Sequence, residues 1–278
     1  MNEYFKIAKL QTNDFTTGKS QAHYCILLID QDAEFSVDLT DYKSMGQSLL
    51  FLSPFQHFQW NGKNTPELTA IHFHGDFYCI EFHKEDVACN GILFNNIYQN
   101  PFFHVKDSTY SEIQNIVSKI NQFSEASKSY DIAIVKSYLQ LLLALSSREK
   151  QLIQSIENLS EHFPSNLSNF QQILDQQFIA NRSVQHYAQY YGMTVDAFSK
   201  NIKRIFKKTP SKLIQERLVL EAKKLLHLSY LNIKEISAKL NFKDEFHFSR
   251  YFKKEVGLSP KVFRDKVGIS IAAKTDMI

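Results

Sequence analysis

The C-terminal third of the chain contains one helical pattern twice, and this repeat constrains the fold more than any other sequence feature. Matching positions recur first at an offset of 49 residues and then at an offset of 50. The first block pairs Val184, Tyr187, Ala188, Tyr191 and Gly192 with Ile233, Ile236, Ser237, Leu240 and Asn241. The second block pairs Thr194, Phe198, Ser199, Lys200, Ile202, Lys203, Thr209, Pro210 and Leu213 with Asp244, Phe248, Ser249, Arg250, Phe252, Lys253, Ser259, Pro260 and Phe263. A chance similarity would not keep apolar, capping and basic positions aligned in this way, so one structural unit occurs twice.

Each copy predicts a short helix, a tight turn and a second helix. The turn falls at Gly192 or Asn241, residue types that tolerate a positive φ. Thr194 or Asp244 then caps the second helix, in which core residues alternate with polar and basic ones. This order is the helix-turn-helix plan, whose second helix enters a DNA major groove.

A helix is also expected between the two copies, over Pro210–Leu226, because this segment has no interior Gly or Pro. Such a helix would act as a rigid spacer, and consecutive major grooves on one face of DNA lie about 34 Å apart. Charge agrees with a DNA-facing C-terminal part. From Gln171 onward there are 20 Lys and Arg against 10 Asp and Glu, whereas the preceding residues hold 12 against 19.

The N-terminal part has a different pattern. Residues 1 to about 105 predict short strands separated by turn formers, which indicates a small barrel or sandwich. Helical spacing begins at about Ser111, and a longer helical stretch covers roughly residues 129–160. We therefore expect an α+β protein with an N-terminal domain over residues 1–162 and an all-α domain over residues 168–267.

Composition and cysteine usage exclude several classes of protein. No apolar run approaches the ~18 residues that a membrane helix needs. The first residues lack the cleavage site of a signal peptide, and no membrane partner is expected. The cysteines are three, Cys25, Cys79 and Cys89, without a CxxC spacing, which argues against a disulfide framework and a structural zinc. A cytoplasmic protein without a cofactor is expected.

The C-terminal motifs resemble those of the AraC/XylS family of bacterial transcription regulators. They are RLVLEAKKLL (Arg217–Leu226), IKEISAKLNFKDEFHFSRYFKKEVGLSP (Ile233–Pro260) and VFR (Val262–Arg264). The resemblance covers about Phe170 to Arg264 and implies two helix-turn-helix units that read adjacent major grooves of an operator in double-stranded DNA. Family members often carry an N-terminal cupin-like β-barrel that binds a small molecule, followed by helices that dimerise. The resemblance therefore implies such a barrel, a small-molecule effector and a homodimer.

The resemblance also places base contacts at Lys200 and Arg250 and near the start of the second helix of each unit, here called the reading helix. The candidate base-reading residues are Val195, Asp196, Ser199, Lys200, Glu245, Phe246, His247, Ser249 and Arg250. Arginine can form two hydrogen bonds with guanine, and Ser or His can bond several bases. The candidate phosphate contacts are Lys203, Arg204, Lys253 and Lys254, which would position the protein without reading sequence. Each could instead be an ordinary surface residue.

Two positions depart from the family pattern. Asn241 stands where the family usually has Gly, and Lys207 occupies the place of the Gly found at Gly257 in the other copy. Asn tolerates the left-handed conformation, so neither change threatens the predicted fold. The first copy is the less typical of the two.

A weaker signal for a metal lies in the N-terminal part, where His72 and His74 would share one strand face. Glu81 and His83 follow in the same region. The metal-binding cupin pattern, however, needs a Gly ahead of the HxH and a Glu four or five residues after it, where Tyr78 and Cys79 stand, and Glu81 comes too late. A polar face, or a ligand pocket lined by His and aromatics, fits better, and no metal is expected. Trp60 and Tyr78 could line an apolar pocket, but such residues are more often part of the core.

Three functions remain open at this point. The leading one is a ligand-responsive, dimeric transcription regulator that is not an enzyme. The second is a ligand-independent regulator whose N-terminal domain only dimerises or binds a protein. The third is a metal-dependent cupin enzyme fused to a DNA-binding domain.

Overall fold

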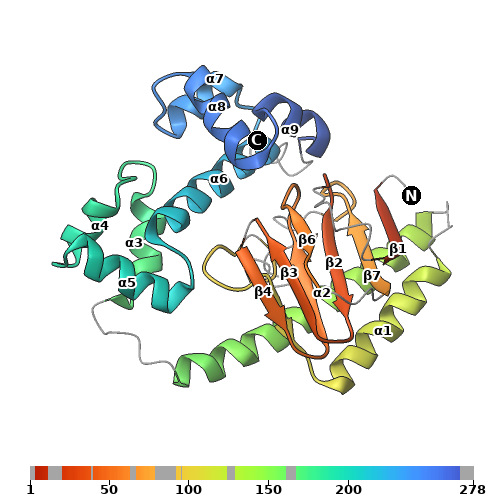
Figure 1. Cartoon of the computed structure of the whole chain (residues 1–278). Coiled ribbons are helices and arrows are strands. Elements are labelled where there is room, and N and C mark those ends of the chain that lie inside the picture. Colours follow the sequence, from red (N-terminus) through yellow and green to blue (C-terminus); the bar gives the residue numbers. More distant parts are fainter. Residues whose placement is uncertain are drawn as a thin grey trace.

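The computed structural model describes residues 4–11, 21–38, 40–62, 67–78, 92–94, 96–123, 129–160 and 167–269. For residues 156–160 only the backbone is described. Within the described residues, eight strands and two helices form a strand-rich part, and seven further helices form a helical part (Figure 1). Glu81, His83, Cys79 and Cys89 lie outside the described residues.

The strands of the strand-rich part form two antiparallel sheets. The larger sheet has the order β1 (Phe5–Gln11), β7 (Glu67–Phe73), β2 (Tyr24–Ile29), β5 (Ser48–Leu52) and β8 (Phe102–His104). The smaller sheet has the order β4 (Thr40–Ser44), β3 (Ala33–Val37) and β6 (Phe58–Trp60). Strand β3 pairs with both of its neighbours, and no described ladder joins the two sheets.

The central strands β2 and β5 of the larger sheet are buried on both faces. Tyr24, Ile26 and Leu28 face one hydrophobic core, together with residues of the two helices that follow the strands. The alternate side chains, such as Leu27, face a second core that includes Phe35 and other residues of the smaller sheet. This double burial explains why the strand reads YCILLI, a continuous apolar run without the polar alternation of a half-exposed strand.

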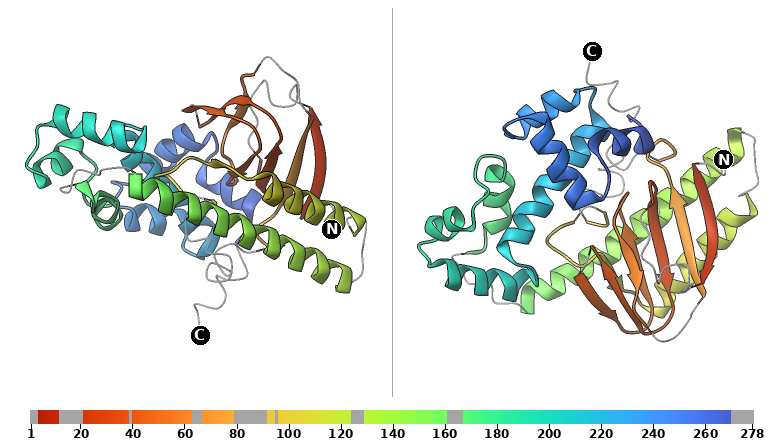
Figure 2. Two further views of the ribbon diagram at one scale, coloured as in Figure 1. Left: turned by 90° about the horizontal axis from the view of Figure 1, so that it is seen from below. Right: turned by 45° about the horizontal axis from the view of Figure 1, so that its top comes forward.

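These two helices are α1 (Asp107–Gln122) and α2 (Ser129–Ser160), which pack along the sheet side by side (Figure 2). The expectation of helices after the strands is thus met. The expectation of a cupin-like barrel is not met as a closed barrel, because the described strands form two open sheets that face each other. The β3 ladder ends at β4 and β6, so the hydrogen bonding does not continue around a barrel within the described residues.

The helical part contains the two expected helix pairs. Helix α3 (Phe170–Gln177) precedes α4 (Val184–Tyr190) and α5 (Val195–Phe206), which form the first pair. Helix α6 (Pro210–Leu228) leads to the second pair, α7 (Ile233–Lys239) and α8 (Glu245–Val256), and α9 (Pro260–Val267) follows. Figure 1 shows the pairs at opposite ends of α6. Among the described residues, no helix is both long enough and apolar enough to cross a membrane.

The strand-rich part also contributes to the core of the helical part. Phe55, in the loop after β5, is 6% exposed and belongs to the same apolar cluster as the helices. Its ring centroid lies 5.1 Å from that of Phe263 on α9. The two parts are therefore joined by packing as well as by the chain.

Candidate nucleic-acid interface

The two turns have the same backbone geometry. Gly192 has φ 63° and Asn241 has φ 55°, so both adopt the left-handed conformation that their residue types tolerate. In each turn the next residue donates its backbone N–H to the small residue of the preceding helix, from Met193 to Ala188 at 2.9 Å and from Phe242 to Ser237 at 3.0 Å. The repeat seen in the sequence is therefore a repeat in three dimensions.

Each reading helix begins at a side-chain cap. Thr194 Oγ1 accepts from the backbone N–H of Ala197 at 3.3 Å at the start of α5, and Asp244 Oδ1 accepts from that of His247 at 2.7 Å at the start of α8. The His247 hydrogen bond lowers the pKa of Asp244, since it favours the carboxylate. The predicted caps are thus present.

One face of each reading helix is buried. Phe198, Ile202 and Phe206 lie on the buried face of α5. Phe248 and Phe252 lie on the buried face of α8. The predicted base-reading residues lie on the other sides. Those that are exposed are Val195, Asp196, Lys200, Phe246, His247 and Arg250, and those that are half-buried are Ser199, Glu245 and Ser249.

Phe246 is the most conspicuous of these residues, because it is a large apolar side chain that is 69% exposed on a reading helix. An exposed aromatic is suited to contact a thymine methyl group.

The four predicted phosphate contacts are also exposed. Lys203 and Arg204 lie in the last turn of α5, and Lys253 and Lys254 lie in the last turn of α8. Basic residues at a helix C-terminus also stabilise the helix through its dipole. Both roles are compatible with their positions.

The ends of the reading helices explain the departure at Lys207. Lys207 has φ 57° and Gly257 has φ 83°, so both copies end in the left-handed conformation. Lysine has a Cβ and is strained there, whereas glycine is not. The Lys207 ammonium donates to the carbonyl oxygen of Arg204 at 2.9 Å, which satisfies one acceptor of the last helical turn.

The second unit has a contact that sequence reasoning missed. Arg182, in the loop between α3 and α4, reaches the carbonyl oxygens of Leu240 and Asn241 in the second turn. No sequence signal indicated this contact, because Leu231 occupies the corresponding position of the other copy at the offset of 49.

His72 and His74 do not form a metal site with a third group among the described residues. His72 is buried, and neither of its ring nitrogens has a hydrogen-bond partner. Burial lowers its pKa to about 4. His74 Nδ1 instead accepts from the backbone N–H of Asp76 at 3.2 Å. Within the described residues no cluster of three potential ligands occurs.

The other residues singled out there have separate positions. Trp60 is buried between the two sheets, and Tyr78 is buried in the core beneath α1 and α2. Neither lines the cavity that the structure forms against α6.

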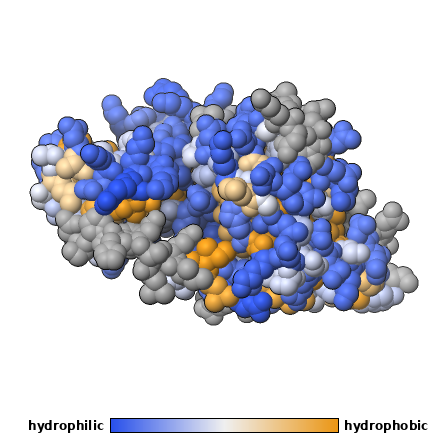
Figure 3. All heavy atoms as spheres, turned by 60° about the horizontal axis from the view of Figure 1, so that its bottom comes forward, coloured by the Kyte–Doolittle hydropathy of each residue, from blue (hydrophilic) through white to orange (hydrophobic). Residues whose placement is uncertain are grey.

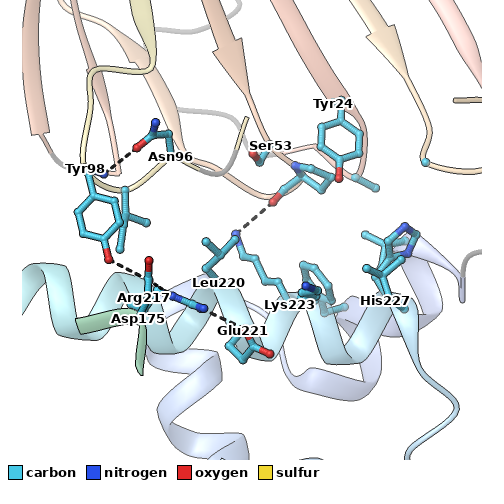
Figure 4. Close-up of a pocket in the computed structure, with 18 of the residues that line it drawn as sticks. Tyr24, Ser53, Asn96, Tyr98, Asp175, Arg217, Leu220, Glu221, Lys223 and His227 are labelled. Carbon is cyan, nitrogen blue, oxygen red and sulfur yellow. Dashed lines mark hydrogen bonds and ion pairs between the residues drawn. The ribbon is translucent and has the colours of Figure 1, made fainter. Parts of the chain in front are cut away.

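That cavity, of about 380 Å³, lies between the strand-rich part and α6 (Figure 4). Tyr24, Ser53 and His74 line it from the strand side, and Lys223 and His227 line it from α6. Its remaining lining residues are Ala22, Pro54, Gly75, Asn96, Ile97, Tyr98, Gln99, Gln171, Asp175, Arg217, Leu220, Glu221, Lys224, Leu228, Phe263 and Val267.

Polar contacts join the two parts beside the cavity. Tyr98 donates its hydroxyl to Asp175 Oδ1 at 2.9 Å, and Arg217 Nε donates to the same oxygen at 2.6 Å (Figure 4). Lys223 donates to the carbonyl oxygen of Pro54 at 3.1 Å, and burial lowers its pKa. Any molecule in this cavity would touch both parts.

Comparison with known proteins identifies a domain within the helical part and relatives whose matches are longer than that part. The family described as a helix-turn-helix domain matches residues 187–266. The transcriptional activator RhaS of Enterobacter sp. is 23% identical over 163 residues, a match that spans 58% of this chain and 56% of RhaS. The virulence regulon transcriptional activator VirF of Yersinia enterocolitica is 22% identical over 220 residues, or 78% of this chain and 79% of VirF.

Among solved structures, ToxT from Vibrio cholerae O395 aligns with 95% of this chain and 98% of its own at 12% identity, with a TM-score of 0.42. The C-terminal domain of AraT from Geobacillus stearothermophilus aligns with 40% of this chain and 93% of its own at 22% identity, with a TM-score of 0.37.

Two capped helix pairs with matching turns define this chain as a tandem helix-turn-helix protein. Within that class, the matched domain and the named transcriptional activators support the resemblance to the AraC/XylS family.

Proposed function

We propose that this protein is a transcription regulator that inserts α5 and α8 into adjacent major grooves of operator DNA. The observation that carries the proposal is the pair of matching reading helices, each capped, each with one buried face and one polar face, on either side of α6. The base-reading and phosphate-contacting residues are those predicted above, and residues 168–267 are the DNA-binding domain.

The test is selection of duplex DNA from a random pool by the full chain, followed by footprinting of the winning sequence. We expect protection of two consecutive major grooves on one face, with affinity that falls steeply as salt rises. Weak binding without sequence preference would contradict the proposal. The named relatives are activators, so a reporter gene placed behind the selected site is expected to rise in the presence of the protein.

We further propose that a small acidic molecule modulates this activity from the cavity between the strand-rich part and α6. The cavity has walls from both parts, so an occupant would change how the reading helices are held. Lys224 lines it, is exposed, and forms no ion pair among the described residues, and His227 lies one turn further along α6. The positive charge of Lys224 favours an anion.

This proposal is tested with a panel of small carboxylic acids by thermal melting and by operator affinity. A true effector raises the melting temperature and changes operator affinity, and both effects weaken in Lys224→Met. Arg148→Met, on the distant helix α2, is the control. A compound that raises the melting temperature without changing affinity is not an effector.

An alternative is a regulator that needs no effector and uses its strand-rich part only to dimerise. The observation in its favour is α2, on which Leu141 is 46% and Leu152 is 54% exposed. Hydrophobic side chains form patches on the face that contains α1 and α2 (Figure 3). We propose this face for a homodimer, and Leu141→Glu with Leu152→Glu is expected to yield a monomer in light scattering. A dimer that persists in the double variant would exclude this face.

A metal-dependent enzyme is the weakest alternative, and we propose that the protein is not an enzyme. His72 and His74 lack a third potential ligand among the described residues, and their side chains line different cavities. Metal analysis of the purified protein tests this, and stoichiometric metal would revive the enzyme hypothesis.

A further inference from the structure

One side chain of the first helix-turn-helix unit reaches into the turn of the second. Arg182 Nη2 donates to the carbonyl oxygen of Leu240, at the end of α7, and to that of Asn241 at 3.1 Å. Carbonyl groups at a helix C-terminus have no partner within their own helix, so the guanidinium satisfies acceptors that would otherwise depend on water. Asn241 is also the left-handed residue that shapes the turn.

The same guanidinium lies on an aromatic ring that supports the second reading helix. The guanidinium carbon of Arg182 is 4.4 Å from the centroid of the Phe242 ring, within the range of a cation–π contact. That ring packs against α8, with centroids 5.4 Å from His247, 5.3 Å from Phe248 and 5.2 Å from Tyr251. A displacement of Arg182 would therefore move the Phe242 ring and, through it, α8.

The backbone on both sides of Arg182 is held by the first unit. Buried Tyr187 donates its hydroxyl to the carbonyl oxygen of Asn181 at 2.9 Å, and Ser183 caps α4 by accepting from the backbone N–H of His186. Arg182 thus extends from a loop that α4 keeps in place. Because this loop is held in place and the guanidinium contacts two carbonyl oxygens, the contact can fix the orientation of the second unit relative to the first.

Apart from this contact, the two units are connected through α6 and the short segment that follows it. After α6 ends at Leu228, an irregular segment leads to Asn232, which caps α7. The second unit also packs on α6 through apolar side chains, and Arg264 of α9 donates to the carbonyl oxygens of Leu226 and Leu231 at 2.9 and 2.7 Å. Arg182 adds a contact with the first unit at the turn between α7 and α8.

We propose that Arg182 is a positioning residue that sets the orientation of α8 relative to α5, and with it the spacing of groove segments that the protein accepts. Adding one base pair between the two segments moves the second by about 3.4 Å and turns it by about 34°. A linked pair of units cannot follow that change, whereas an unlinked pair follows it in part. The inference rests on the proposed function, because it concerns the reading of DNA.

The experiment uses the full chain and the duplex selected from a random pool by the wild type. Affinity is measured for this duplex and for versions with one or two base pairs inserted between the footprinted segments. The variants are Arg182→Met, which keeps an apolar stem without the guanidinium, and Arg182→Lys, which keeps the charge without the paired N–H groups. Lys239→Met is the matched control, because it removes an exposed positive charge from α7 that makes none of the contacts given above for the Phe242 ring.

We expect the wild type and Lys239→Met to lose at least about tenfold in affinity on a single insertion. Arg182→Met should bind the original duplex several-fold more weakly and lose less than threefold on insertion, with Arg182→Lys in between. An unchanged insertion penalty in both Arg182 variants, with normal melting curves, overturns the inference while leaving DNA binding intact. If the wild type selects no sequence at all, the proposed function fails instead.

Discussion

Arg250 and Lys253 are both exposed cations on α8, yet their contributions to DNA binding should differ in kind. We expect Arg250→Ala to lower operator affinity by about 1–3 kcal/mol and to relax base preference at one position, because a guanidinium can form two hydrogen bonds with guanine. Lys253→Ala should weaken binding to all sequences alike and reduce the salt slope by about 1. Gel-shift titrations against single-base operator variants at several salt concentrations measure both, and unchanged specificity in Arg250→Ala would remove it from the reading set.

Lys207 offers a second prediction at the residue scale. Its left-handed conformation costs a residue with a Cβ about 1 kcal/mol relative to glycine. We expect Lys207→Gly to stabilise the protein by up to about that amount, offset in part by the lost hydrogen bond to Arg204. The reverse substitution at the equivalent position of the second copy, Gly257→Ala, should destabilise the protein. Urea unfolding measures the stability of both variants. Equal effects in both variants would contradict the explanation.

At the scale of the element, the two reading helices begin with caps of different chemistry. Thr194 does not ionise at ordinary pH, whereas the Asp244 carboxylate does. Helix α8 should therefore depend on pH at its N-terminus in a way that α5 does not.

The sign of this dependence follows from the lowered pKa of Asp244, whose ordinary value is 3.8. Because the folded pKa lies below the unfolded one, the cap contributes its full stability above about pH 4 and loses it as pH falls through the folded pKa. Asp244→Asn keeps a capping side chain that does not titrate in this range. The stability of the wild type relative to Asp244→Asn should fall on acidification, as measured by urea unfolding between pH 6 and pH 3. A difference that stays constant would show that the cap is not coupled to ionisation.

At the scale of the whole molecule, Phe55 couples the strand-rich part to the helical part. We expect Phe55→Ala to cost about 3 kcal/mol, because it removes a buried ring from the shared core. The single tryptophan, Trp60, is buried in the strand-rich part and reports its unfolding by fluorescence, while far-ultraviolet circular dichroism follows the helices.

The two signals should separate in Phe55→Ala. Phe246→Ala removes an exposed ring of the same size and is the control that should leave unfolding unchanged. Coincident transitions at an unaltered midpoint in Phe55→Ala would show that this ring does not couple the two parts.

The sequence by itself determined the tandem helix pairs, their turns and their caps. Gly192, Thr194 and Asp244 act on residues within a few positions of themselves, so the residue type at each position is enough to predict the local structure. The exposed sides of α5 and α8 follow from helical spacing for the same reason.

Only the tertiary structure decided how distant segments meet. Short apolar strands were compatible with a barrel or a sandwich, and the pairing of β3 with β4 and β6 is what produced two sheets. The cavity against α6, the insertion of Phe55 and the reach of Arg182 to Asn241 also join residues far apart in the chain. Such contacts depend on long-range packing and side-chain direction, which leave no periodic or local signal in one sequence.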